Sequence, residues 1–201
     1  MMSTSSCSRL FMVVPLCAAL LACSSRTQAT AAPPAAAASE PVSPAPGDSS
    51  VAADSSSWLQ VDSAGRTAAL NVLVTRKPGA PSALLNGFRA GGARIIIPVG
   101  WTVKWNWRST DSTAPHSLVV MVQREKVPLE GGRPSFSNAM TRMVTEGLRP
   151  GEIDQSTFEA EEAGWYWMMC GVPGHALEGE WLELRVDAEA NTARVDLKKK
   201  T

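Results

Sequence analysis

A short stretch near the C-terminus carries three side chains that can bind a metal ion. Cys170, His175 and Glu180 follow one another in the spacing C-x4-H-x4-E, directly after the apolar run GWYWMM. A cysteine thiolate and an imidazole, held close together on a tight Pro-Gly loop, suit a copper ion that cycles between two oxidation states. We therefore take this loop as the candidate site of the chemistry.

The counts of cysteine and histidine favour the same site. Of the four cysteines, three lie within the first 23 residues, which leaves Cys170 as the only thiol in the rest of the chain. In an exported protein a single thiol forms no internal disulfide, so it is buried and inert, reactive, or a metal ligand. The chain has two histidines, His116 and His175, and both lie where a metal site would require them.

The elements that must position these side chains have the pattern of β-strands. From Trp101 to Arg108 apolar and polar residues alternate strictly, which predicts a half-buried strand of an antiparallel sheet. Turn-forming Pro-Gly and Gly-Gly pairs separate the other candidates, which are residues 68–75, 93–99, 116–123, 156–160, 164–170, 181–187 and 192–197. Seven or eight short strands predict an all-β fold, a Greek-key β-sandwich. One short helical insertion is expected at 137–146, where Met140, Met143 and Val144 have helical spacing.

The N-terminus predicts an export signal. Arg9 precedes thirteen mostly apolar residues, and the segment ends in Leu-Leu-Ala-Cys at Cys23. Thirteen residues are too few to span a bilayer but are typical of the apolar core of a secretory signal. The ending resembles a bacterial lipobox, so we expect residues 1–23 to be a lipoprotein signal peptide, with lipid on Cys23 anchoring the protein to a membrane. The alternative is an ordinary secretory signal.

Residues 24–57 differ in composition from the rest of the chain. Of these 34 residues, 24 are Ala, Pro or Ser and none is aromatic. Such a segment buries too little apolar surface to offset its ordering entropy, so we expect a disordered tether. Residues 58–201 are then one domain of ordinary size, placed in the cell envelope, in the periplasm or at the cell surface.

The charge balance argues against nucleic acid as a partner. The chain has 19 Lys and Arg against 19 Asp and Glu, and its basic residues are scattered except for the terminal run 198–200. A run of this kind is typical of a solvated tail. We expect no nucleic-acid binding and a monomeric protein.

Three pieces of the chain, within residues 68–186, together resemble a known family. They are NGFRAGGARIIIPVGWTVKWNW, APHSLVV and GWYWMMCGVPGHALEGEW, in this order. They are similar to the cupredoxins and, among these, to the sulfocyanins, which are membrane-anchored blue copper proteins. The resemblance implies one mononuclear copper ion bound by His116, Cys170 and His175. It also implies that the protein is an electron carrier and not an enzyme.

The chain departs from this family at Glu180. Sulfocyanin-like sequences carry methionine there, as a weak axial ligand, between the glycine and tryptophan that this chain keeps as Gly179 and Trp181. A carboxylate is a harder, anionic donor, so we expect Glu180 to bind the copper ion and to lower its reduction potential. In the alternative, Glu180 faces solvent and the carbonyl group of Pro115 is the nearest axial oxygen. A compensating methionine, from Met140, Met143, Met168 or Met169, is less favoured.

Further residues are expected around the ligands. Ser117 is placed to tie the first histidine to the cysteine loop by hydrogen bonds. An apolar collar around the exposed edge of His175 is predicted as the surface on which redox protein partners dock, and it comprises Val172, Pro173, Ala176 and Leu177. Two other functions stay open. One is a red-copper enzyme or small-molecule sensor of the nitrosocyanin type with an open copper position; the other is copper carriage.

Overall fold

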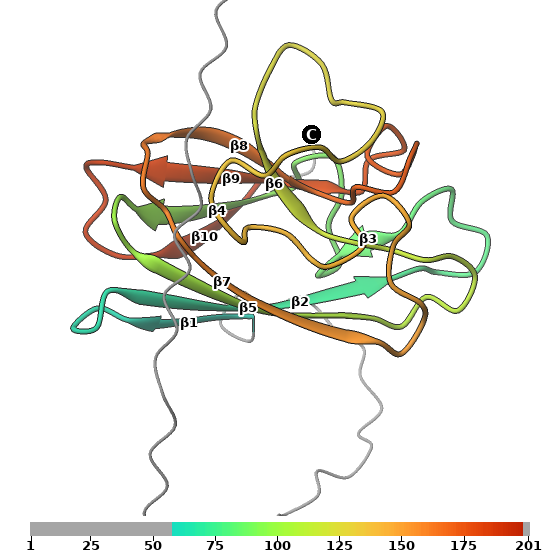
Figure 1. Ribbon diagram of the computed structural model, residues 1–201, viewed down its shortest axis with the longest axis horizontal. Helices are drawn as coiled ribbons and strands as arrows, with labels where there is room; N and C mark the ends of the chain where they lie inside the picture. The colour runs from blue at the N-terminus through green and yellow to red at the C-terminus, as the bar shows by residue number, and fades with distance from the viewer. Residues whose placement is uncertain (1–57, 199–201) are drawn as a thin grey trace, which may run out of the picture. The chain divides into compact units, whose positions relative to one another are not determined.

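The computed structural model describes residues 58–198, which fold into two β-sheets stacked face to face (Figure 1). The expected signal peptide at 1–23, with Cys23, and the tether at 24–57 lie outside the described residues. Within 58–198 there is no helix, and hence none long and apolar enough to cross a membrane.

The first sheet has the strand order β1-β2-β5-β7, with the short β3 added to β2. β5 pairs parallel with β2 and antiparallel with β7, so the expectation of a purely antiparallel sheet is wrong at this strand. Its strands are β1 (Leu59–Asp62), β2 (Thr67–Thr75), β3 (Leu84–Leu85), β5 (Thr102–Ser109) and β7 (Ile153–Glu159).

The second sheet has the order β10-β4-β9-β8-β6, with β4 and β9 parallel and the other pairs antiparallel. Its strands are β4 (Ala93–Pro98), β6 (Val119–Val122), β8 (Gly164–Met169), β9 (Trp181–Asp187) and β10 (Arg194–Leu197). The predicted all-β sandwich is therefore confirmed, with ten strands within residues 58–198. The sequence-based prediction missed β1 and β3.

The main core lies between the sheets, and β5 shows why its sequence forms a strand there. Trp105 and Trp107 are at most 1% exposed, whereas Lys104, Asn106 and Arg108 between and beside them face solvent. The predicted alternation is thus confirmed. Because side chains on a strand alternate between faces, β5 gives one face to the core and the other to water.

The expected helical insertion at 137–146 is wrong. This segment runs beside β6: the amide of Thr141 donates to the carbonyl of Leu118, and the amide of Val120 donates to the carbonyl of Ala139, at 2.8 and 2.9 Å. Asn138 and Met143 have φ angles of +64° and +55°, which a right-handed helix does not allow. The methionines at 140 and 143 are 40% and 54% exposed, so they do not pack a helix onto the sandwich.

A smaller apolar cluster lies on the other face of the second sheet. It contains Val119, Trp167, Met169 and Ala176, with Val127 and Val144 of the long β6–β7 connection packed against it. This connection therefore covers the end of the sheet next to Cys170.

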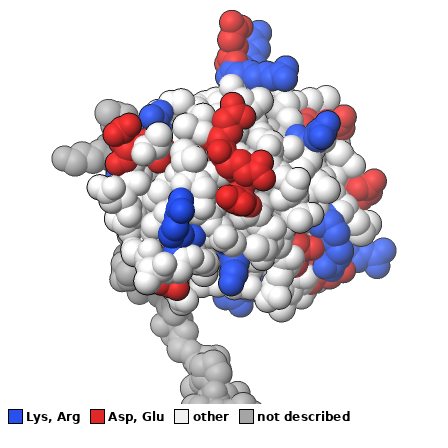
Figure 2. Space-filling model, turned by 60° about the vertical axis from the view of Figure 1, so that its left-hand side comes forward, with Lys and Arg blue, Asp and Glu red and all other residues white. Residues whose placement is uncertain are grey.

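On the face drawn in Figure 2, basic side chains are scattered and acidic ones gather near the middle, without a continuous basic area.

Candidate metal centre

Two adjacent strands bring the ends of the metal-binding loop together. Cys170 directly follows the last residue of β8, and Glu180 directly precedes the first residue of β9. The strands are antiparallel neighbours, with Met169 opposite Trp181, and the amide of Cys170 donates to the carbonyl of Glu180 at 3.0 Å. The hairpin geometry therefore fixes the positions of both residues.

The loop between them is held by backbone hydrogen bonds. The amide of His175 donates to the carbonyl of Val172 at 3.2 Å, and the amide of Glu180 donates to the carbonyl of His175 at 3.1 Å. Gly174 has a φ of +85°, which glycine adopts without strain, and its amide donates to the carbonyl of Leu129 at 2.8 Å. The loop thus turns His175 back toward Cys170 without help from a metal ion.

His116 enters the site from a separate part of the chain. Its amide and carbonyl both pair with Leu148, at 3.1 and 2.7 Å, in an isolated β-bridge before β6. Gly147 is needed beside this bridge because a Cβ atom there would lie 2.9 Å from Cβ of Pro115 and 2.8 Å from Cγ2 of Val172. Close packing of three chain segments therefore fixes the backbone of His116.

The structure brings all four predicted side chains together. One ligand atom from each of His116, Cys170, His175 and Glu180 lies within 4.8 Å of the others. Nδ1 of His116 lies 2.9 Å from both carboxylate oxygens of Glu180, and Nδ1 of His175 lies 3.3 Å from one of them. The sulfur of Cys170 lies 3.5 Å from Nδ1 of His175. Glu180 is 1% exposed, so the alternative in which it faces solvent is wrong.

The centre is buried except at one edge. Cys170 and His116 are at most 1% exposed, whereas the side chain of His175 is 20% exposed. Burial, and then the charge of Glu180, raises the pKa of the Cys170 thiol. Without a cation the sulfur therefore keeps its proton, and a metal ion that binds there must displace it.

Glu180 and His116 stabilise each other's charged forms. Burial alone would raise the pKa of Glu180, but hydrogen bonds from His116 and His175 outweigh burial and lower it. Burial alone would lower the pKa of His116, but the hydrogen bonds and charges of Glu180, and next of Asp111, raise it. An ionised carboxylate at the centre is therefore available as an anionic metal ligand.

Ser117 links the two parts of the site, in the position predicted for it. Its amide lies 3.4 Å from the sulfur of Cys170, and its hydroxyl accepts from the amide of Gly171 at 2.9 Å. The same hydroxyl donates to the carbonyl of Val144 at 2.6 Å. The His116 segment, the cysteine loop and the β6–β7 connection are thus joined at one buried side chain.

Asp111 is a contact of the site that the sequence reading missed. Its Oδ2 atom lies 2.9 Å from Nε2 of His116, on the side of the ring away from Glu180. Asp111 is 3% exposed and lies in the loop after β5. The spacing of five positions between Asp111 and His116 matches neither a helical nor a strand period. The run of loop residues DSTAPH was therefore the one signal in the sequence that could have pointed to Asp111.

The predicted collar around His175 is correct only in part. Val172 is half-buried, Pro173 is exposed, and Leu177 is 59% exposed. Ala176 is fully buried in the smaller apolar cluster and does not contribute to this surface. Leu129, whose carbonyl accepts from Gly174, is 59% exposed and extends the apolar surface instead.

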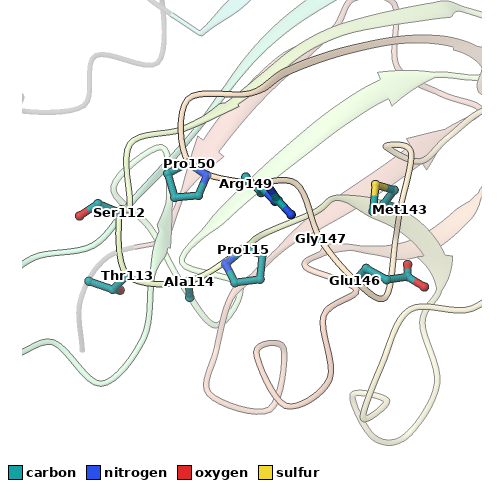
Figure 3. Close-up of a pocket in the computed structure, with 9 residues that line it drawn as sticks. All are labelled: Ser112, Thr113, Ala114, Pro115, Met143, Glu146, Gly147, Arg149 and Pro150. Carbon is teal, nitrogen blue, oxygen red and sulfur yellow. The ribbon is translucent and has the colours of Figure 1, made fainter.

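A shallow hollow of about 400 Å³ lies beside the segment that leads into His116. It is lined by residues 112–115 and, from a second segment, by Met143, Glu146, Gly147, Arg149 and Pro150 (Figure 3). Pro115 and Gly147, which both line it, pack against each other next to the backbone of His116. Met143 lines this hollow with its side chain 54% exposed, while Met168 and Met169 are buried in the two apolar clusters.

The donor set fits copper. One thiolate and two imidazoles are the ligands of electron-transfer copper sites, and a nearby carboxylate oxygen is a donor that Cu(II) accepts. Three of the four side chains are buried, and backbone hydrogen bonds hold all of them in place. The chain could therefore hold a metal ion with little rearrangement.

Comparison with known proteins places the chain in a family. The model of the Sulfocyanin (SoxE) domain matches residues 54–194. A sulfocyanin of Sulfolobus acidocaldarius is 27% identical over 129 residues, which are 61% of this chain and 64% of that protein.

Solved structures of rusticyanin are also similar. Reduced rusticyanin is 21% identical, with 61% of this chain and 85% of that chain covered and a TM-score of 0.44. Rusticyanin from Thiobacillus ferrooxidans is 22% identical, with 61% and 83% covered and a TM-score of 0.44. Because the family model spans well over half of its residues, this chain belongs to the sulfocyanin family of cupredoxins.

Proposed function

We propose that this protein is a copper-binding electron carrier in which His116, Cys170, His175 and Glu180 hold one mononuclear copper ion. The observation that carries this proposal is the convergence of the four ligand atoms to within 4.8 Å. Membership of a family whose curated relative is named a sulfocyanin supports it. Copper, when bound, supplies the one-electron redox couple, and the protein turns over no substrate.

The geometry of the site favours electron transfer. Bridges and hydrogen bonds that do not involve a metal fix the backbone of His116 and of the 170–180 loop. A site built in advance imposes nearly the same ligand positions on both oxidation states, so little must move when an electron arrives or leaves. Burial of Cys170 keeps water and oxidants away from the sulfur.

The exposed edge of His175 is the proposed point of electron entry and exit. Exposed apolar residues lie near it in the loop, Pro173 and Leu177, and in the segment bonded to the loop, Leu129, and a redox protein partner can cover them in a brief, weak complex. In line with the N-terminal sequence, we place the domain in the cell envelope, attached to a membrane through lipid on Cys23, as a monomer that binds no nucleic acid.

A voltammetric experiment tests the electron-carrier function. We expect the copper-loaded domain, residues 58–201, to show one reversible one-electron wave and an intense sulfur-to-copper absorption. Leu177→Lys should slow electron self-exchange at an unchanged potential, whereas Val122→Lys, which changes an equally apolar residue 48% exposed on β6, should not. Loss of copper to a weak chelator within minutes would instead support copper carriage.

A red-copper enzyme or sensor remains the rival, and the buried carboxylate of Glu180 is the observation that favours it. Such a site keeps an open coordination position, which a small anion can occupy. Optical and paramagnetic resonance spectra should therefore be recorded with and without azide. Spectra that do not respond to azide support the electron carrier, and spectra that shift support the rival.

A further inference from the structure

The imidazole ring of His116 is bound at both of its nitrogen atoms. Nδ1 faces Glu180, and Nε2 lies 2.9 Å from Oδ2 of Asp111. Both His116 and Asp111 are buried, at 1% and 3% exposure. Since an ionised carboxylate can only accept, both ring nitrogens carry a proton in the metal-free protein: Nε2 donates to Asp111 and Nδ1 donates to Glu180. A metal ion that binds at Nδ1 would displace the proton there and leave the Nε2 proton on its contact with Asp111. The ring therefore has one nitrogen for the metal site and one for the protein.

Asp111 is itself held in place. The amide and the hydroxyl of Thr113 both donate to Oδ1, at 2.8 and 2.6 Å, which leaves Oδ2 for His116. The amide of Asp111 donates to the hydroxyl of Ser109 at 3.1 Å, and Nε of Arg76 lies 3.8 Å from Oδ2. The two oxygens thus have separate partners, and the carboxylate cannot rotate without losing a hydrogen bond on each side.

We infer that Asp111 is a positioning residue for the metal ligand His116, which it orients through Nε2 so that the lone pair of Nδ1 faces the metal. A carboxylate that accepts a hydrogen bond from the far nitrogen of a ligating imidazole fixes the orientation of the ring. It also makes the other nitrogen donate its lone pair to the metal more strongly. It also adds a negative charge near the metal, which stabilises Cu(II) more than Cu(I). The last consequence rests on the proposed copper function; the positioning applies to zinc as well.

The alternative role for Asp111 is local. Its contacts with Thr113 form a side-chain-to-backbone turn of the kind that aspartate often makes in loops, and this turn needs no metal site. Asp111→Asn separates the two roles. Asparagine has one accepting oxygen, so it keeps the turn with Thr113 only by placing its NH2 group opposite Nε2 of His116, which removes the ring contact together with the charge.

The test uses Asp111→Asn and Asp111→Ala in the full domain. Glu183→Gln is the matched control, because Glu183 is also a buried carboxylate with cationic partners but it contacts Arg94 and Lys198 and not His116. The first measurement is the imidazole spectrum of the zinc-loaded protein by nitrogen-15 nuclear magnetic resonance. We expect the Nε2 proton of His116 to be visible and slow to exchange in the wild type and in the control, and to exchange rapidly in Asp111→Ala.

The second measurement is affinity, for zinc and for copper separately, by competition with a chelator. Loss of an oriented carboxylate partner typically costs about 10- to 100-fold in metal affinity, and we expect this loss for Asp111→Ala. The third is the reduction potential of the copper-loaded protein. If Asp111→Asn loses a tenfold preference for Cu(II) over Cu(I), the potential rises by about 59 mV.

Three results would overturn the inference. The first is an Nε2 proton of His116 that exchanges as slowly in Asp111→Ala as in the wild type, and the second is a zinc affinity of Asp111→Ala within twofold of the wild type. The third is a potential shift in Asp111→Asn no larger than that in Glu183→Gln. Together they would mean that Asp111 only forms the turn with Thr113. If Asp111→Ala does not fold, the same measurements on Asp111→Asn test whether Asp111 positions His116. If the protein binds zinc but forms no coloured copper site, the electron-carrier proposal fails while the zinc data still decide the role of Asp111.

Discussion

Both carboxylate oxygens of Glu180 lie 2.9 Å from Nδ1 of His116, although 64 positions separate the two residues in the chain. Glu180 stands where the family resemblance implies a methionine, and the contact shows that its carboxylate lies inside the site. A buried anion in this position stabilises a doubly charged cation more than a singly charged one. The residue that departs from the family is thus the one best placed to set the reduction potential of the proposed copper site.

Replacing Glu180 with methionine should raise the reduction potential and deepen the blue colour. The thioether is neutral and soft, so Cu(II) loses more stabilisation than Cu(I). We expect at least a tenfold change in relative affinity, which corresponds to about 59 mV. Voltammetry and the visible spectrum measure both effects, with Glu180→Gln as the control that removes charge but keeps an oxygen. An unchanged potential would mean that Glu180 does not touch the metal.

Replacing Ser117 with alanine should destabilise the metal-free domain. Its hydroxyl accepts from Gly171 and donates to Val144, so the buried amide of Gly171 and the partly buried carbonyl of Val144 both lose this partner. Each such loss costs about 1–3 kcal/mol, and urea unfolding measures it. Thr145→Ala is the nearby control, because the hydroxyl of Thr145 bonds only to the exposed carboxylate of Glu146. Equal stability of the two variants would mean that the hydrogen bonds of the Ser117 hydroxyl do not stabilise the domain.

Two glycines with similar backbone angles should respond differently to alanine. Gly147 and Gly151 have φ angles of +76° and +84°, so alanine at either position costs about 1–2 kcal/mol of strain. At Gly151 the new Cβ atom meets nothing within 4 Å, whereas at Gly147 it would lie 3.0 Å from the backbone nitrogen of His116. Overpacking costs about 1–3 kcal/mol more, and it should also weaken metal binding. Gly147→Ala and Gly151→Ala with equal metal affinities would contradict this.

Stability should depend on pH through Glu183. Burial alone would raise the pKa of Glu183, but hydrogen bonds from Lys198 and Arg94 outweigh it and lower the pKa from 4.5. A carboxyl group whose pKa is lower in the folded state contributes stability above pH 4.5 and loses it as the pH falls through the folded value. Glu183→Gln should remove this dependence. Urea unfolding between pH 7 and pH 3 measures it, and parallel curves for the two proteins would refute it.

The sequence predicted what depends on local pattern. The alternation around Trp105 predicted β5, and the spacing of Cys170, His175 and Glu180 predicted a loop that the strands β8 and β9 close. His116 was added as a ligand because the motif APHSLVV resembles the family's first histidine motif, and the count of only two histidines agreed with it. The strand and the loop follow from a few neighbouring residues, and the role of His116 from a motif shared with the family, so no knowledge of the tertiary structure was needed.

What the sequence did not predict depends on contacts between distant segments. Residues 137–146 have helical spacing, but pairing with β6 and the positive φ angles of Asn138 and Met143 override it. Ala176 turns into the smaller apolar cluster because the β6–β7 connection packs there. Asp111 reaches His116 only because Thr113 fixes the turn between them. None of these contacts has a signature in residue spacing.

X-ray absorption at the copper edge tests the central proposal most directly, because it identifies the atoms bound to the ion. We expect one sulfur and two imidazole nitrogens around copper in the loaded wild-type domain. We also expect Cys170→Ser to lose both the sulfur scattering and the intense absorption. A wild-type spectrum without sulfur, or a Cys170→Ser protein that keeps its colour, would contradict the assignment of His116, Cys170, His175 and Glu180 as a copper site.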